Sequence, residues 1–391
     1  MSKAADLPGA AVVDAARKPP HHFQRLLHPL CGADLTTLLG VLVGSGGIAL
    51  QHLPRAGIAL AAAIARWPFS TVEGVVTAGR RRQSGPMPAP LFIVGHWRSG
   101  TTHLYNVLTR SPAFGYVPPI ATGLPWDMLG LGRVLRPLLE RALPRERFVD
   151  SLPVRPDSPQ EDEIPLANMQ LLSFYHGIYF PRRLEERFWQ GVFFDGCRVE
   201  AIARWRRRHV LFLEKLALLQ PGRRLLIKNP VYSARIALLR EIWPEARFIH
   251  IYRNPYRVFA STRTFHTKLL EEFALQRFER ARIDELIFET YPRMMGRLLE
   301  DARALPEEAY VEIRFETFVR NPLGELTRVY ETLGLDGFVA ARSRFEAYLG
   351  EVRDPRAARH PLPAEAALQV RQRWAPFIER WGYAADEVED G

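Results

Sequence analysis

A short apolar run followed at once by a glycine-flanked loop constrains this sequence more than any other feature. Residues 91–94 read LFIV, and residues 95–102 read GHWRSGTT. A continuous apolar run of this length is typical of a strand buried on both faces of a parallel sheet. Apolar residues then recur with helical spacing at Leu104, Val107 and Leu108. The order strand, loop, helix predicts an α/β fold in which backbone N–H groups surround a phosphate.

The loop also indicates which residues would hold that phosphate. Gly95 and Gly100 would allow a ligand to approach the backbone closely. The spacing G-x-x-x-x-G begins a Walker A loop, but Thr101 stands where an NTPase has its lysine. The cation is instead Arg98, whose forked guanidinium can bind a phosphate with two hydrogen bonds. We therefore expect an anhydride donor held without that lysine, and a plain tight turn is the alternative.

A second unit of strand, helix and strand follows later in the chain. Its strands are residues 224–229 (RLLIKN) and 247–252 (RFIHIY), and residues 233–243 between them have helical spacing. Such a crossover is parallel and right-handed. The sequence therefore predicts a parallel sheet flanked by helices.

Both strands of this unit end in basic residues. Lys228 closes the first strand, and Arg253 follows the second, just before a helix that starts near Pro255 and carries Ser261. Ligands of such sheets bind at the carboxyl ends of the strands. We expect Arg98, Lys228, Arg253 and Ser261 to converge on one polyanion, the alternative being isolated surface charges and caps.

Two uncharged apolar runs precede this core, at residues 35–51 and 56–65. Three interpretations compete: helices packed on the main domain, attachment to a bilayer surface through residues 31–80, and a spanning helix. A spanning helix needs about 20 apolar residues, which the first run lacks. A flanking basic group would meet anionic headgroups in the second interpretation; its members are His21, His22, Arg25, Arg80, Arg81 and Arg82.

Residues 83–90 are rich in Pro, Gly and Ser, which predicts a boundary. We assign residues 1–85 to an apolar helical N-terminal region and residues 86–391 to a catalytic domain. Residues 117–222 would form a helical insertion in that domain. Because this segment is rich in aromatic residues, it could build an apolar acceptor site, or simply a core of its own.

Composition narrows the partners and the compartment. The 53 Lys and Arg residues against 43 Asp and Glu give a net charge of +10, which favours anionic partners. With only two cysteines, Cys31 and Cys197, the chain has no disulfide framework and no Cys-x-x-Cys zinc motif. Residues 1–24 lack the apolar block of a secretion signal. We expect a cytoplasmic location, with peripheral attachment to the inner face of the membrane as an option.

The phosphate loop and the Arg253 segment together resemble the sulfotransferase family that uses 3′-phosphoadenosine 5′-phosphosulfate (PAPS). The similarity spans roughly residues 90–335 and implies a P-loop-like three-layer core. It implies that Arg98 holds the 5′-phosphate, that Arg253 and Ser261 bind the 3′-phosphate, and that Lys228 lies near the transferred sulfuryl group. The implied nucleotide site comprises Gly95, Trp97, Arg98, Ser99, Gly100, Thr101, Thr102, Arg253 and Ser261.

The sequence offers several candidates for the general base. Some members have a histidine two residues after the lysine, but Pro230 stands there in this chain and cannot accept a proton. The acidic cluster at residues 161–163 offers Glu161 and Glu163, with Asp162 expected to point elsewhere on a helix. Such acids also simply complement a helix N-terminus. His96 in the loop is a rival base or a residue that shapes the loop.

These observations predict a PAPS-dependent sulfotransferase that transfers a sulfuryl group in line to a hydroxyl or amine without a metal. The acceptor would be a small molecule or, as the slight favourite, a lipid or hydrophobic alcohol, and no nucleic acid is expected as a partner. The alternatives are a P-loop kinase or NTPase without the Walker lysine and a non-enzymatic basic membrane adaptor. The sequence does not indicate the oligomeric state.

Overall fold

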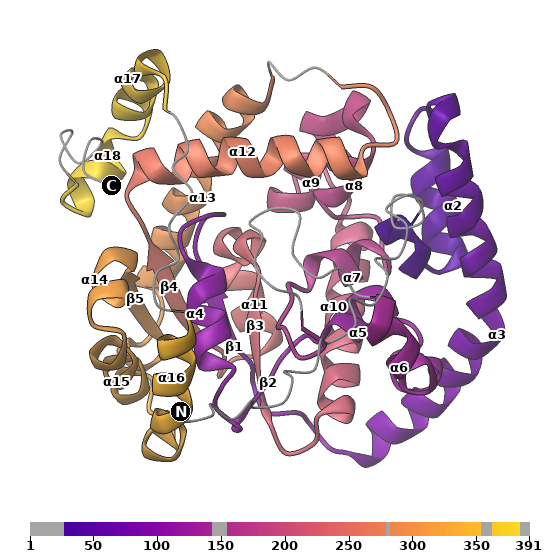
Figure 1. Ribbon diagram of the computed structural model, residues 1–391, viewed down its shortest axis with the longest axis horizontal. Helices are drawn as coiled ribbons and strands as arrows, with labels where there is room; N and C mark the ends of the chain where they lie inside the picture. Colours follow the sequence, from indigo (N-terminus) through magenta and orange to yellow (C-terminus); the bar gives the residue numbers. More distant parts are fainter. Residues whose placement is uncertain (1–26, 143–154, 279–281, 353–361, 384–391) are drawn as a thin grey trace, which may run out of the picture.

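Five parallel strands in the order β2-β3-β1-β4-β5 form the sheet at the centre of the molecule. The computed structural model describes residues 27–142, 155–278, 282–352 and 362–383 (Figure 1). The strands are β1 (Leu91–Val94), β2 (Phe114–Gly115), β3 (Arg224–Lys228), β4 (Arg247–Tyr252) and β5 (Tyr310–Arg314).

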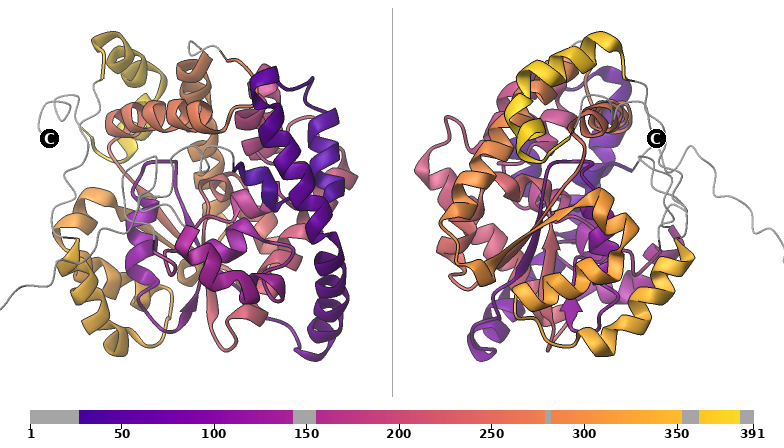
Figure 2. Two further views of the ribbon diagram at one scale, coloured as in Figure 1. Left: turned by 45° about the vertical axis from the view of Figure 1, so that its right-hand side comes forward. Right: turned by 90° about the vertical axis from the view of Figure 1, so that its left-hand side faces the viewer.

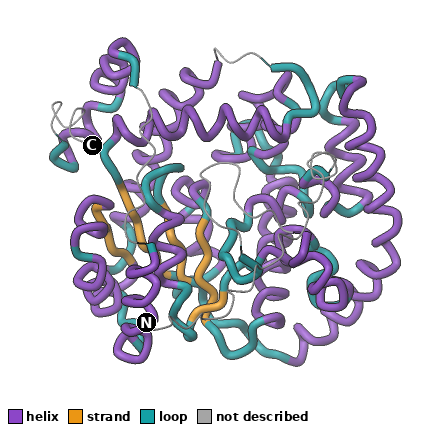
Figure 3. Tube along the Cα trace, in the orientation of Figure 1, coloured by secondary structure: helices purple, strands orange, loops and turns teal. Residues whose placement is uncertain are grey.

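Helices surround this sheet, as the purple and orange segments of Figure 3 show. The α-helices are α2 (Leu35–Val43), α3 (Leu53–Gln83), α4 (Thr101–Leu108), α5 (Pro119–Gly123), α6 (Leu131–Ala142), α7 (Glu163–Ala167), α8 (Tyr175–Tyr179), α9 (Leu184–Phe193), α10 (Val199–Leu219), α11 (Ile236–Ile242), α12 (Pro255–Phe273), α13 (Arg282–Arg303), α14 (Phe315–Arg320), α15 (Pro322–Thr332), α16 (Phe338–Glu351), α17 (Ala364–Arg373) and α18 (Ala375–Arg380). Short 3₁₀ turns are η1 (Pro29–Gly32), η2 (Leu50–His52), η3 (Pro181–Arg183), η4 (Pro230–Ala234) and η5 (Glu307–Ala309).

The sheet is buried on both faces because its side chains alternate between two cores. In β1, Phe92 and Val94 pack into the core that includes residues of α10 and α13. Leu91 and Ile93 pack on the opposite face into the core formed with α4, α15 and α16. This three-layer arrangement confirms the predicted parallel sheet flanked by helices. It explains why these strands read as unbroken apolar runs.

One element differs in detail from the sequence expectation. The helix expected at residues 233–243 divides into η4 and α11, which meet at Arg235, where the backbone leaves the helical conformation (φ −139°, ψ 20°). The regular elements that the structure describes within residues 117–222, from α5 to α10, are helices joined by loops. The division into an N-terminal region and a catalytic domain stays a prediction. Helix α3 ends at Gln83 and β1 begins at Leu91.

The apolar N-terminal runs form two helices that pack against each other. Helices α2 and α3 lie along one edge of the molecule, in indigo in Figures 1 and 2. Within the described residues, no helix combines the length and apolar character needed to cross a bilayer. Residues 1–26 lie outside the described part of the chain. They include His21, His22 and Arg25, and the expectation about a secretion signal rests on them.

Candidate functional site

The parallel sheet brings the residues singled out in the sequence to one edge. Strands β3, β1, β4 and β5 are successive neighbours that run in the same direction, so their carboxyl ends lie side by side. The glycine-flanked loop (residues 95–100) follows β1, Lys228 ends β3, Arg253 follows β4 and Phe315 follows β5. Segments more than 200 positions apart in the sequence therefore meet at this edge.

The loop after β1 depends on backbone conformations that glycine favours. Gly95 has φ 142°, and a Cβ there would overlap the carbonyl oxygen of Ile251. Gly100 has φ 101°, and a Cβ there would overlap the ring of Phe315. Between them, Arg98 adopts φ 68°, a left-handed conformation that is uncommon for a residue with a side chain. Such conformations direct successive N–H groups toward one point, which suits an anion.

Arg98 connects the loop to helix α12. Its Nε donates a hydrogen bond to Ser261 Oγ at 2.9 Å, and Thr262 Oγ1 donates to the carbonyl oxygen of Trp97 at 3.2 Å. Ser233 of η4 holds the start of the loop, because its Oγ accepts a hydrogen bond from Gly95 N at 2.8 Å. The two sequence motifs therefore form one site.

The start of α12 adds further positive charge to this site. Asn254 caps the helix by accepting a hydrogen bond from Tyr256 N at 3.0 Å, and Arg253 lies 4.5 Å above the ring of Phe315. Burial lowers the pKa of Arg253, the carboxylate of Glu316 raises it, and the nearby Arg98 and Arg257 lower it again. Guanidinium groups this close repel each other, and a bound polyanion would relieve that repulsion.

Lys228 lies between the phosphate loop and the acidic cluster. Its Nζ donates a hydrogen bond to Thr102 Oγ1 at 3.1 Å and forms an ion pair with Glu161 Oε1. The side chain of Lys228 is 3% exposed and that of Glu161 is 19% exposed. Glu161 is thus the member of the cluster that a substrate could reach.

Asp162 and Glu163 turn inward instead. Both accept hydrogen bonds from Asn229 Nδ2, each at 2.9 Å, and Glu163 also accepts one from Ser173 Oγ at 2.7 Å. Asp162 further accepts a hydrogen bond from the Tyr232 hydroxyl. Asp162 therefore points away from Glu161, but Glu163 shares the direction of Asp162 rather than that of Glu161, because α7 begins only at Glu163.

The buried carboxyl groups and His96 have shifted pKa values. Burial raises the pKa of Asp162 to about 7, and the neighbouring Glu163 adds to the rise. Burial also raises the pKa of Glu163. His96 is buried, its Nδ1 lies 3.0 Å from the Trp97 carbonyl oxygen, and burial lowers its pKa to about 4. A neutral imidazole with so low a pKa is a weak base, which favours a loop-shaping role.

The raised pKa of Asp162 predicts a pH dependence of stability. Because the folded protein holds this proton up to about pH 7 while the unfolded chain loses it near pH 4, the contribution of Asp162 to stability falls as pH rises through that window. The Asp162→Asn variant loses hydrogen bonds, so it is less stable than the unaltered chain at low pH. Because asparagine does not titrate, the unfolding free energy of the variant lacks the decrease with rising pH that Asp162 causes. Its deficit in unfolding free energy should therefore shrink from pH 4.5 to 7.5, as measured by urea unfolding.

Asp336→Asn, at an exposed position, is the matched control for removing one carboxylate. A deficit for Asp162→Asn that stays constant or grows with pH would contradict the assignment.

Three residues of the site were not singled out in the sequence. They are Asn229, which holds the acidic cluster, Ser233, which binds Gly95 N, and Phe315, which lies under Arg253. Asn229 and Phe315 each follow or end a strand at its carboxyl end, and that position was a usable signal. Ser233 carried none, since a serine in a turn is common.

The aromatic residues of segment 117–222 fill two kinds of position. Among the described residues, seven are buried in the main core: Phe174, Tyr175, Tyr179, Phe180, Phe188, Trp205 and Phe212. Four others are partly buried against it: Trp126, Trp189, Phe193 and Phe194. Packing thus accounts for the first group, and the use of this segment as an acceptor site stays a prediction.

Comparison with known proteins identifies the family. A profile described as the sulfotransferase family matches residues 90–339, which include all five strands of the sheet. The chain belongs to the sulfotransferase family. This chain is also 30% identical over 294 residues, 75% of each chain, to the omega-hydroxy-beta-dihydromenaquinone-9 sulfotransferase Stf3 of Mycobacterium bovis, and equally to that of Mycobacterium tuberculosis.

Solved sulfotransferase structures share the fold. Sulfotransferase STF9 from Mycobacterium avium has a TM-score of 0.64 at 16% identity, covering 89% of this chain and 96% of that one. Sulfotransferase STF1 from Mycobacterium tuberculosis has a TM-score of 0.61 at 17% identity, covering 88% and 91%. Family membership makes this chain a transferase of sulfuryl groups. The kinase and adaptor alternatives are thereby set aside.

Proposed function

We propose that the enzyme transfers the sulfuryl group of PAPS to a hydroxyl group on a lipid-like acceptor. The observation that carries the nucleotide assignment is the 2.9 Å hydrogen bond from Arg98 Nε to Ser261 Oγ. It brings the loop suited to a 5′-phosphate and the helix suited to a 3′-phosphate into contact. One molecule with phosphate groups at both ends fits such a site better than ATP, whose phosphates form a single chain.

Each part of the site has a distinct task in this proposal. The N–H groups of the loop and Arg98 hold the 5′-phosphate, while Arg253 and Ser261 hold the 3′-phosphate. Phe315, 4.5 Å from the Arg253 guanidinium and in contact with Gly100, gives the nucleotide site an apolar wall. Trp97 supports the loop from the buried side.

Glu161 and Lys228 perform the chemistry. The carboxylate of Glu161 takes the proton of the acceptor hydroxyl as its oxygen bonds to sulfur. The bond between sulfur and the bridging oxygen breaks, and the electron pair leaves with the phosphate. Lys228 and Arg98 neutralise the charge that develops there, without proton transfer to the leaving group. Glu163, hydrogen-bonded on both oxygens, positions the segment that carries Glu161.

The acceptor class rests on the relatives and on this chain's own apolar surface. The name of Stf3 states that its substrate is a hydroxylated dihydromenaquinone, a quinone lipid. In the present chain, the N-terminal helices α2 and α3 carry many exposed apolar side chains. A hydroxyl on a long apolar molecule is therefore the substrate we propose.

The nucleotide proposal predicts selective stabilisation. A hundred-fold excess of adenosine 3′,5′-bisphosphate over its Kd should add about 2.7 kcal/mol, which raises Tm by several degrees. ATP with magnesium should raise Tm far less. Differential scanning fluorimetry gives both values, and the reverse order would reject the proposal.

With labelled PAPS as donor, hydroxylated isoprenoid or fatty alcohols should accept label in preference to sugars and tyrosine peptides. If only the sugars or peptides were labelled, the proposed acceptor class would be rejected, whereas the assignment of PAPS as donor would stand.

A further inference from the structure

Helix α3 has its polar side chains on the inside and its apolar side chains on the outside. Between Arg55 and Arg80 its charged residues are Arg66 and Glu73, and both are buried, at 8% and 6% exposure. The opposite face carries large exposed apolar side chains: Leu53, Ile64, Trp67, Phe69, Val72, Val75 and Val76. An ordinary surface helix has the reverse arrangement.

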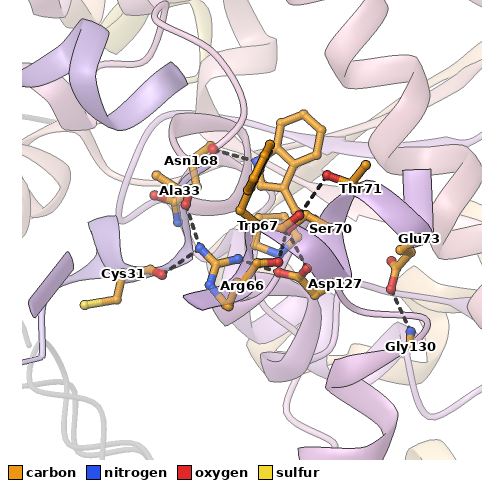
Figure 4. A network of polar contacts seen from close by, with 12 residues as sticks. Cys31, Ala33, Arg66, Trp67, Ser70, Thr71, Glu73, Asp127, Gly130 and Asn168 are labelled. Atoms are coloured by element: carbon orange, nitrogen blue, oxygen red, sulfur yellow. Dashed lines mark hydrogen bonds and ion pairs between the residues drawn. The ribbon is translucent and has the colours of Figure 1, made fainter. Parts of the chain in front are cut away.

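The buried charges of α3 fasten the helix to the body of the enzyme (Figure 4). Arg66 forms an ion pair with Asp127 and donates to the carbonyl oxygens of Cys31 and Ala33, at 2.9 and 2.6 Å. Glu73 accepts a hydrogen bond from Gly130 N at 2.6 Å.

Lys215 of α10 joins the same network. Its Nζ lies 2.8 Å from Glu73 Oε1 and donates to the carbonyl oxygens of Pro125 and Trp126. These bonds fix the orientation of α3, so its apolar face is held outward.

That outward face offers almost nothing to a protein partner. Interfaces between proteins carry a hydrogen bond about every 100–200 Å². Among the exposed residues 56–79, the side chains with a polar group are Trp67, through its indole N–H, and Thr71, whose Oγ1 already donates to the Trp67 carbonyl oxygen at 2.8 Å. A surface of this kind suits acyl chains, which need no hydrogen bonds.

The C-terminal end of α3 adds a matching positive charge. Arg80, Arg81 and Arg82 form its last turn; Arg80 and Arg82 are exposed, and Arg81 pairs with Glu214. With 31 residues, the helix is roughly 46 Å long. An uncharged apolar face beside an arginine cluster fits the boundary between acyl chains and anionic headgroups.

We propose that α3 docks the enzyme on the surface of an anionic bilayer, lying in the plane of the membrane with its Trp67 and Val75 side inserted. The helix is also connected to the candidate active site. The loop held by Arg66 and Glu73 includes Trp126, whose Nε1 donates a hydrogen bond to the Asn168 carbonyl oxygen at 2.9 Å. Asn168 is the C-cap of α7, the helix that begins at Glu163. The docked helix would thus be joined through hydrogen bonds to the segment that carries the acidic cluster.

Flotation of the full chain with vesicles tests the surface without donor or acceptor, so its outcome is independent of the proposed sulfuryl transfer. Vesicles of phosphatidylglycerol and phosphatidylcholine should bind the chain, and added salt should weaken binding. Val72→Glu with Val75→Glu should lower the affinity at least ten-fold. Val339→Glu with Leu368→Glu is the matched control, at exposed apolar positions on α16 and α17.

Two further measurements test the proposal without the double valine variant, which could lose vesicle binding simply because it is misfolded. Arg80→Gln with Arg82→Gln should lower affinity for the anionic vesicles about five-fold for each arginine, and leave neutral vesicles unaffected. In the unaltered chain, brominated lipid should quench tryptophan emission, and Trp67→Phe should remove that quenched component. Each variant should keep the urea unfolding midpoint of the unaltered chain, which shows that it is folded.

Unchanged vesicle binding by the double valine variant would overturn the proposal. A failure of the unaltered chain to bind vesicles would also overturn it. If sedimentation then shows a dimer that the double valine variant dissociates, the apolar face is a contact between copies of the chain.

Discussion

Glu161→Gln is expected to lower kcat for sulfuryl transfer by about 10²- to 10⁴-fold, the usual contribution of a general base. The amide keeps the size of the side chain but cannot take the acceptor proton. Nucleotide affinity should change little, because Arg98, Arg253 and Ser261 are untouched. Steady-state kinetics with labelled PAPS and calorimetric binding of adenosine 3′,5′-bisphosphate separate the two effects.

Glu163→Gln is the matched control two positions away. Its carboxylate is fully buried and accepts hydrogen bonds from Ser173 and Asn229. This variant should lose stability while its kcat falls by less than about ten-fold. A larger fall in kcat for Glu163→Gln than for Glu161→Gln would show that the base is not Glu161.

Arg253→Ala is expected to remove the preference for a 3′-phosphate. Losing charged hydrogen bonds to a phosphate weakens binding by roughly 10- to 150-fold. Adenosine 3′,5′-bisphosphate should lose that affinity, whereas adenosine 5′-phosphate, which has no 3′-phosphate, should not.

Arg98→Ala should instead weaken both nucleotides by similar factors, because its guanidinium is assigned to the 5′-phosphate that both carry. Isothermal titration of the two nucleotides measures this contrast.

Arg342→Ala on α16 is the control for the loss of an exposed arginine, since Arg342 pairs with Glu346 far along the chain from the site motifs. Equal losses of both nucleotides in the Arg253→Ala variant would contradict its assignment to the 3′-phosphate. Binding of adenosine 5′-phosphate that survives Arg98→Ala unchanged would contradict the assignment of Arg98.

The sequence predicted the parts of the fold whose causes are local. Strand β1, the glycine-flanked loop and α4 follow from an apolar run, two glycines and helical spacing within residues 91–108. The start of α12 follows from Asn254, which caps it, and Pro255, which fits its first turn. Because parallel strands end at the same edge of a sheet, the meeting of the two motifs was predictable as well.

The choice among acidic residues 161–163 was not predictable. Glu161 reaches Lys228, while Asp162 and Glu163 bind Asn229, more than 60 positions further along the chain. Which carboxylate faces the site depends on the start of α7 at Glu163, and spacing alone did not indicate that start. The position of Phe315 beneath Arg253 likewise requires β5 beside β4.

The sequence by itself determined the local structure, namely the glycine-flanked loop, the cations that end the strands and the helix that carries Ser261, because a few neighbouring residues fix each of them. Only the tertiary structure decided which way side chains face. In α3 the usual rule would send Arg66 and Glu73 to solvent. Asp127, Gly130 and Lys215 meet them on the inside, and these buried partners turn the apolar face outward.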